Sequence, residues 1–188
     1  KNNHDELGRT KFHKHTWPKL FFDKIKNKNI FQDYHIITAI RNPWDQIVSY
    51  YWYGNKQPNM IIKRKTKQSK AQKNFENFVN TKFTYRSYEE ADDTLNKDPI
   101  QYISYINEKF IDDKITDYIY FENINNSFYE IGAKIIVDFI DNPLPRLKAD
   151  RRKIKKHYSW YYNDRTRKKV EKYFEKTINR FNYKFEIK

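Results

Sequence analysis

The segment from residue 34 to residue 53 constrains the fold most, because it joins an apolar run, a sharp stop and a helical pattern. The run Tyr34–Ile40 is short, mostly apolar and rich in β-branched residues, which predicts a buried strand of a parallel sheet. Asn42 is a good helix N-cap and Pro43 suits the first helical position, so a helix is predicted to follow. A strand that turns directly into a helix favours an alternating α/β chain.

The rest of the chain continues this alternation of apolar strands and amphipathic helices. A second strand is predicted at Asp117–Phe121, and residues 100–106 fit either a strand or a helical turn. Further helices are predicted over about residues 17–25, 74–79 and 127–139, and one from Asn163 that buries Val170, Tyr173, Phe174, Ile178 and Phe181. Polar and charged loops are expected over residues 54–72, 86–97 and 146–156. These elements predict one α/β domain with a mainly parallel sheet.

The composition is basic and aromatic. The net charge is +14, aromatic residues make up 18% of the chain and apolar residues 38%. Large aromatic side chains can fill a core that is short of Leu and Val. The charge has two interpretations: a genome biased towards Lys, Asn and Ile, or an anionic partner such as a nucleotide, an acidic glycan or nucleic acid.

The chain contains no cysteine, so disulfides and cysteine-based metal or nucleophile chemistry are excluded. It has no run of about 18 apolar residues and no visible secretory signal. We therefore expect no membrane span and a cytoplasmic location.

The predicted turn after the first strand has the chemistry of a phosphate site. Helix N-termini present unpaired N–H groups and a partial positive charge. Arg41 directly precedes this helix and can make a bidentate contact to phosphate. Ser49 lies on the same helical face as Asn42. An ordinary capped helix with an exposed arginine fits the same residues.

The pattern Arg-Asn-Pro-x-Asp, followed after three residues by Ser-x-Tyr, resembles the 3′-phosphate-binding element of sulfotransferases that use 3′-phosphoadenosine 5′-phosphosulfate (PAPS). The resemblance implies that Arg41 and Ser49 bind the 3′-phosphate of the donor. Three further segments are similar to the carbohydrate-directed branch in the same order: residues 120–124 to its "FENL" segment, residues 144–147 to "LPHL", and residues 161–185 to its closing helix and "FGYxF" tail. Together the matches cover about residues 10–188. They imply a three-layer, P-loop-like sulfotransferase fold with a mainly parallel sheet.

The same resemblance assigns a catalytic base. Transfer of a sulfuryl group to a hydroxyl requires removal of the hydroxyl proton, and a histidine suits that task near neutral pH. His15 matches the family position best, and His13 is the second candidate. A zinc site at this pair has no third ligand at a suggestive spacing, so we expect no metal.

Two other segments carry candidate site residues. Glu122, at the end of the second strand, either binds the acceptor or caps the turn into the next helix. In the basic loop, Asp150 stands where the family often has serine, while Arg151 and Arg152 can contact donor phosphate; Arg152 is the preferred donor-binding residue. A solvated basic loop is the alternative for both arginines.

The most serious departure from the family concerns the loop that binds the 5′-phosphosulfate. The chain contains no Pro-Lys-x-Gly-Thr-Ser type turn for the 5′-phosphosulfate, since Gly8, Gly54 and Gly132 lie in other contexts. We expect residues 1–188 to form a single sulfotransferase-like domain without its N-terminal strand and that loop, through truncation upstream or through loss of the loop.

The predicted activity is transfer of a sulfuryl group from PAPS to a carbohydrate hydroxyl, with an anionic acceptor, release of 3′-phosphoadenosine 5′-phosphate (PAP) and no metal. A non-catalytic protein that binds PAP or anionic glycans is the first alternative. A nucleic-acid-binding module is the third interpretation, although no nucleic-acid-reading motif is present and no nucleic acid partner is expected.

Overall fold

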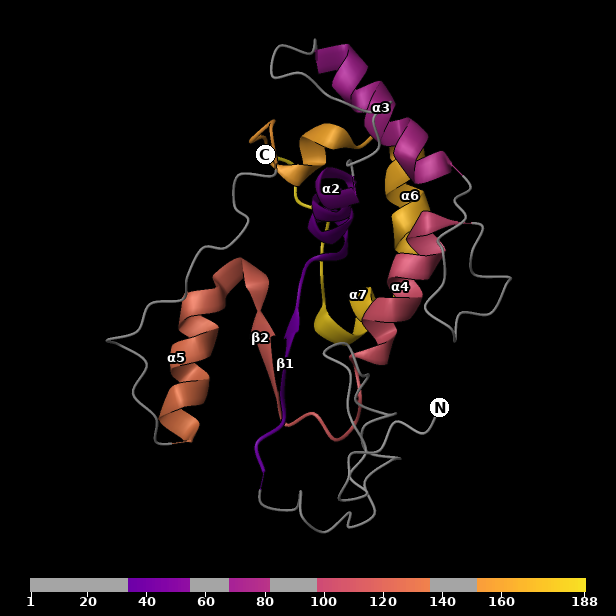
Figure 1. Cartoon of the computed structure of the whole chain (residues 1–188). Coiled ribbons are helices and arrows are strands. Elements are labelled where there is room, and N and C mark those ends of the chain that lie inside the picture. Colours follow the sequence, from indigo (N-terminus) through magenta and orange to yellow (C-terminus); the bar gives the residue numbers. More distant parts are fainter. Residues whose placement is uncertain (1–33, 55–67, 82–97, 136–151) are drawn as a thin grey trace, which may run out of the picture.

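The computed structural model describes residues 34–54, 68–81, 98–135 and 152–188, in which helices and strands are mixed (Figure 1). In chain order the elements, with η marking 3₁₀ helices, are β1 (Ile37–Ile40), α2 (Pro43–Gly54), α3 (Gln68–Asn80), α4 (Pro99–Lys109), β2 (Asp117–Tyr120), η4 (Phe121–Asn123), α5 (Ile124–Lys134), η6 (Tyr158–Tyr161), α6 (Asp164–Tyr173) and α7 (Glu175–Phe181).

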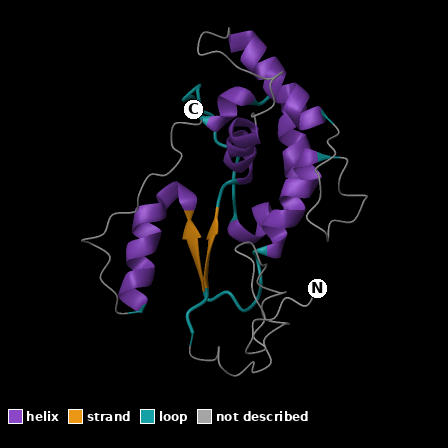
Figure 2. Ribbon diagram, in the orientation of Figure 1, coloured by secondary structure: helices purple, strands orange, loops and turns teal. Residues whose placement is uncertain are grey.

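The two strands run side by side in the same direction (Figure 2). In their register Ile37 lies opposite Asp117 and Ile40 opposite Tyr120. This confirms an α/β chain with parallel pairing at the coarse level. Because the pair is parallel, both strands end at the same edge, where β1 leads into α2 and β2 into η4. Residues 41 and 121 therefore start the segments that leave this edge.

The expectation of a fully buried first strand is wrong. The strand starts at Ile37 rather than Tyr34, its burial alternates, and only Ile40 is buried at 3% exposure, against 36% for Ile37. The described part of the sheet has two strands, so each has one hydrogen-bonded neighbour there. A face and an edge of β1 therefore stay open to solvent within that part.

Helix boundaries follow local capping more closely than the apolar pattern. The predicted helix after Asn42 is confirmed as α2, with Pro43 as its first residue. In α4 the side chain of Asp98 accepts from the backbone N–H of Ile100 at 2.9 Å, with Pro99 in the first turn, which settles residues 100–106 as helix.

Three other boundaries differ from the sequence expectation. Residues 68–72, expected in a loop, belong to α3, and the helix expected from Ser127 begins at Ile124. The single C-terminal helix is two helices, because Phe174 takes the non-helical angles φ −100° and ψ 15° between α6 and α7. Val170 and Phe174 are fully buried as expected, while Tyr173 and Ile178 are partly buried.

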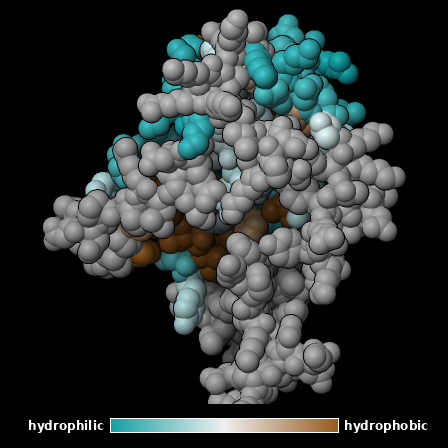
Figure 3. All heavy atoms as spheres, turned by 45° about the horizontal axis from the view of Figure 1, so that its top comes forward, coloured by the Kyte–Doolittle hydropathy of each residue, from teal (hydrophilic) through white to brown (hydrophobic). Residues whose placement is uncertain are grey.

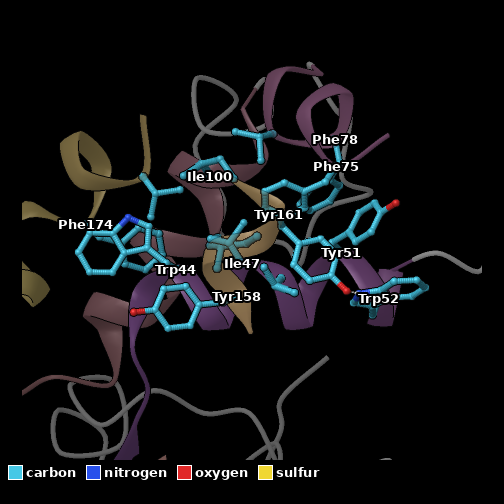
Figure 4. Close-up of a cluster of buried hydrophobic side chains, with 14 of the residues drawn as sticks. Trp44, Ile47, Tyr51, Trp52, Phe75, Phe78, Ile100, Tyr158, Tyr161 and Phe174 are labelled. Atoms are coloured by element: carbon cyan, nitrogen blue, oxygen red, sulfur yellow. Dashed lines mark hydrogen bonds between the residues drawn. The ribbon is translucent and has the colours of Figure 1, made fainter. Parts of the chain in front are cut away.

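Aromatic side chains fill the core, as the composition predicts (Figure 4). Phe75 of α3 shows the packing: its ring centroid lies 5.4 Å from Tyr51 and 4.9 Å from Tyr162. The buried cluster comprises Trp44, Ile47, Val48, Tyr51, Trp52, Phe75, Phe78, Val79, Ile100, Tyr102, Ile103, Tyr158, Tyr161, Val170 and Phe174. All but Tyr158 and Tyr161 come from α2, α3, α4, α6 and the residue that ends α6. The core thus lies among these helices, and it includes Trp44 in the first turn of α2.

The surface is uneven in polarity. On the face shown in Figure 3, hydrophobic side chains of described residues are exposed below a hydrophilic upper part. Phe121, just past β2, is 45% exposed. Searching the described ranges for a membrane-spanning helix finds none of sufficient length and apolar character.

Candidate anion-binding site

The carboxyl ends of the two strands bring a guanidinium onto an aromatic ring. Arg41 follows β1 and Phe121 follows β2, and the guanidinium carbon of Arg41 lies 4.0 Å from the centroid of the Phe121 ring. A cation over an aromatic face is attracted by the negative charge density of the ring. The ring therefore supports one face of the guanidinium, whose side chain stays 22% exposed.

Asp45 joins two arginines from distant parts of the chain. The Nε of Arg41 donates to Oδ2 of Asp45 at 2.7 Å, and its Nη2 pairs with the same oxygen. The Nη2 of Arg152 donates to Oδ1 at 2.6 Å. Both arginines were predicted to bind the donor, and the structure brings them together on one carboxylate at the start of α2.

The charge state of Asp45 follows from these contacts. Burial is the largest single influence and by itself raises the pKa of the carboxyl. The charges of Arg41 and Arg152, with the hydrogen bonds they donate, outweigh it and hold the pKa of Asp45 below its usual value. Asp45 is therefore ionised at neutral pH, and the three groups carry one net positive charge.

The position of Arg152 depends on the aromatic core. Two residues further on, the carbonyl of Ile154 accepts a hydrogen bond from the hydroxyl of Tyr161 at 2.5 Å. That hydroxyl accepts in turn from Nε1 of Trp52 on α2 at 3.1 Å. Tyr161 is 2% exposed. The described residues 152–154 are thus tethered to the helix that carries Asp45.

The start of α2 is capped twice. The Oδ1 of Asn42 accepts from the backbone N–H groups of Trp44 at 3.1 Å and Asp45 at 3.3 Å, as expected of an N-cap. The N–H of Asn42 itself donates to Oε1 of Glu122 at 2.5 Å. The expectation that Glu122 caps the next helix is wrong, because the parallel register places this carboxylate beside the neighbouring strand's turn. A role for Glu122 in acceptor binding remains a prediction.

The C-terminal tail also reaches Glu122. The hydroxyl of Tyr183 lies 3.4 Å from Oε2 of Glu122 and donates to it. Burial, followed by the Glu122 charge, raises the pKa of Tyr183, so the phenol keeps its proton. Glu122 therefore accepts hydrogen bonds from the start of α2 and from the C-terminal tail.

Of the remaining predicted site residues, the structure describes Ser49 but not the predicted catalytic base. Ser49 lies on α2 one turn beyond Asp45 and is partly exposed. Residues four apart on a helix have Cβ atoms about 5–6 Å apart, so Asp45 and Ser49 lie on one side of α2, while Arg41, just before the helix, pairs with Asp45. The predictions for His13, His15, Asp150 and Arg151 lie outside the described residues.

His157 is the histidine nearest this cluster in sequence among those described, five residues after Arg152. Its Nδ1 lies 2.8 Å from Oγ of Ser159 and accepts from the Ser159 backbone N–H at 3.4 Å. Burial, then the charge of Lys188, lowers the pKa of His157. With Nδ1 as acceptor, the neutral ring carries its proton on Nε2, so that nitrogen is a donor and not a base in this arrangement.

The contact between Arg41 and Asp45 has a local signal in the sequence. Asp45 stands four residues after Arg41, the spacing at which opposite charges meet on one helix face. The contact with Arg152 spans 107 positions and has no local signal. Within the described ranges no group of three His, Asp or Glu side chains could hold a metal ion.

Comparisons with protein-family models, with curated proteins and with solved structures find no match to this chain. The assignment of function therefore depends on the motifs and on the geometry of this site.

Proposed function

We propose that the protein binds PAP and PAPS through Arg41 and Arg152 and transfers the sulfuryl group of PAPS to a carbohydrate hydroxyl. One observation carries the proposal. Arg41, which the motif resemblance assigns to the 3′-phosphate, and Arg152, which was predicted to contact donor phosphate through its charge, meet at the same carboxylate.

The arginine pair has the donor capacity that a phosphate requires. A guanidinium carries five N–H donors. Arg41 directs Nε and Nη2 at Asp45, and Arg152 directs Nη2 there, so most of the N–H groups are not used by Asp45. A 3′-phosphate is a dianion. The single net positive charge of the cluster therefore attracts a nucleotide with a 3′-phosphate more strongly than one with a neutral 3′-hydroxyl.

In the proposed reaction the acceptor oxygen forms a bond to sulfur, and the bond from sulfur to the bridging phosphate oxygen breaks. PAP leaves with that oxygen, and the hydroxyl proton passes to a base, for which we propose His15. Ser49 adds a hydroxyl contact to the 3′-phosphate. The net charge of +14 suits an anionic acceptor. The proposal includes a three-layer sulfotransferase fold, of which the β1–β2 pair forms one part.

A second candidate is a protein that binds PAP or an anionic glycan without catalysis. The observation in its favour is that the sequence contains no Pro-Lys-x-Gly-Thr-Ser type turn to hold the 5′-phosphosulfate. Binding of PAP without sulfuryl transfer to any glycan acceptor distinguishes this candidate from the enzyme.

Isothermal titration with PAP tests the shared part of both candidates. Arg41→Ala should weaken PAP binding by about 10- to 150-fold, since a charge-assisted hydrogen bond contributes roughly 1.5–3 kcal/mol. Arg41→Lys should restore it only in part because the planar fork is lost. Ser49→Ala should cost less, about 1 kcal/mol for a neutral hydroxyl.

The matched control is Arg165→Ala, which removes an exposed guanidinium from the first turn of α6. Its affinity for PAP should equal that of the wild type. If Arg41→Ala binds PAP as tightly as the control, this end of α2 is structural and does not hold the nucleotide.

A further inference from the structure

Asp45 is a partly buried carboxylate that takes no part in the proposed sulfuryl transfer, yet both site arginines contact it. Its side chain is 17% exposed and each arginine side chain 22%. Arg41 takes one carboxylate oxygen and Arg152 takes the other. The arrangement differs from an isolated surface ion pair, because one anion fixes two cations at once.

We propose that Asp45 is a positioning residue, which holds Arg41 and Arg152 at a fixed separation so that both contact the same phosphate. This inference rests on the proposed function. The two oxygens of a carboxylate are spaced much like two oxygens of a phosphate. Guanidiniums that each hold one oxygen of Asp45 are therefore separated by a distance that one tetrahedral phosphate can bridge as well.

The two arginines depend on Asp45 to different degrees. Arg41 is also supported by the ring of Phe121, and the residue after it is fixed by the contact between the Asn42 N–H and Glu122. For Arg152 the contact with Asp45 is the one ion pair recorded among the described residues. A long arginine side chain loses much rotamer freedom when it binds a ligand, unless it is already held. Loss of Asp45 should therefore act mainly through Arg152.

A competing role predicts the opposite effect. If Asp45 only neutralises the arginines, its removal raises the charge of the cluster from +1 to +2 and should tighten the binding of any anion. The position of Asp45 favours the positioning role. It lies in the first turn of α2, where its own N–H donates to Asn42, so the backbone that carries the carboxylate is fixed.

The test is a double-mutant cycle measured by isothermal titration with PAP at about 0.15 M ionic strength, where exposed charges are screened beyond about 8 Å. The variants are Asp45→Asn, Arg152→Ala and the two combined. Asp164→Asn, which removes the same charge from a side chain 88% exposed on α6, is the matched control. Circular dichroism and thermal unfolding of each sample give the folded fraction to which binding is referred.

Asp45→Asn should bind PAP about 3- to 10-fold more weakly than the wild type, the usual cost of ordering one long side chain. In the Arg152→Ala background the same substitution should change affinity less than about 2-fold, because the side chain it positions is gone. A purely structural loss would persist in that background. Asp164→Asn should match the wild type.

Arginine Nε–H resonances of the wild type give a second readout that needs no variant. The Nε–H that Arg41 donates to Asp45 should exchange slowly with water, both without ligand and at saturating PAP. Accelerated exchange on adding PAP would mean that phosphate displaces Asp45, which overturns the positioning role.

Equal or tighter binding by Asp45→Asn overturns the inference alone and leaves the proposed function intact. An effect of full size in the Arg152→Ala background does the same. Absence of PAP binding by the wild type overturns the proposed function, and the inference with it.

Discussion

The helical part of the molecule and its two-stranded sheet are stabilised by different interactions. Helices α2, α3, α4 and α6 share a core in which Ile47, Phe75 and Val170 are 0% exposed. In the sheet, Ile37 is 36% and Tyr120 39% exposed. Burial of apolar area is the main source of stability in the first part, and it is scarce in the second.

The sheet is tied instead by polar contacts at its start. Asp117 pairs with Lys134 at the end of α5 and lies 3.3 Å from Nδ1 of His35. The hydroxyl of Thr116 accepts from the N–H of Ile36 at 2.9 Å. The arginine cluster lies where the two parts meet, at the turn from β1 into α2. Its geometry is therefore supported from the helical core, through Asp45 and through the hydrogen bond between Tyr161 and the carbonyl of Ile154.

The largest expected difference between the parts is in the cost of truncating an aromatic ring. Phe75→Ala should lower the free energy of unfolding by about 3–5 kcal/mol, because it opens a cavity among buried rings. Phe121→Ala, at 45% exposure, should cost about 1 kcal/mol or less, mostly the contact with Arg41. Urea unfolding of both variants measures the two losses, and equal losses would mean that the helical core and the sheet do not differ in how they are stabilised.

A smaller loss in the free energy of unfolding is expected from removing the charge of Asp45, which lies where the helical core meets the sheet. Asp45→Asn should cost about 1–2 kcal/mol at pH 7 through weakened charge-assisted hydrogen bonds. Because the pKa of Asp45 is lower folded than unfolded, its contribution is complete above about pH 4 and is lost as pH falls through the folded value. Wild-type stability should thus fall more steeply than that of Asp45→Asn between about pH 5 and pH 2.

Unfolding free energies at several pH values over that window test the sign. The exposed Asp164→Asn serves as the control, and its curve should parallel that of the wild type. If Asp45→Asn also runs parallel to the wild type, the two arginines do not stabilise the carboxylate.

The smallest change in the free energy of unfolding is expected from a substitution beside the sheet. Lys134 is 58% exposed in its pair with Asp117. Exposed ion pairs contribute about 0.2–1 kcal/mol, so Lys134→Met should lower the free energy of unfolding by no more than that. Lys168→Met on the exposed side of α6 is a control for the loss of one charge. A loss of about 2 kcal/mol or more would show that the sheet depends on this pair more than its exposure implies.

Local signals predicted the elements that depend on local contacts. The N-cap at Asn42 and the apolar spacing after it predicted α2, and the β-branched run predicted β1. The prediction that β1 is fully buried was wrong, because the burial of a strand depends on which other segments cover it. The break at Phe174 was missed because the apolar spacing runs unchanged through both α6 and α7.

The site divides in the same way. The resemblance predicted Arg41 and Ser49 as donor-binding residues, and Arg152 was added for its charge. The spacing between Arg41 and Asp45 is readable from the sequence. The meeting of Arg152 with Asp45 was not predictable, because it requires the path of the chain across 107 positions. Glu122 was assigned to the wrong helix for the same reason, since its partner belongs to the neighbouring strand's turn.

Thermal unfolding with two nucleotides tests most directly whether the Arg41–Asp45–Arg152 cluster binds a 3′-phosphate. PAP at 100 times its dissociation constant should stabilise the protein by about 2.7 kcal/mol and raise its melting temperature. Adenosine 5′-phosphate at the same concentration, which lacks the 3′-phosphate, should raise it much less. Equal shifts with both nucleotides, or no shift with PAP, would contradict the claim.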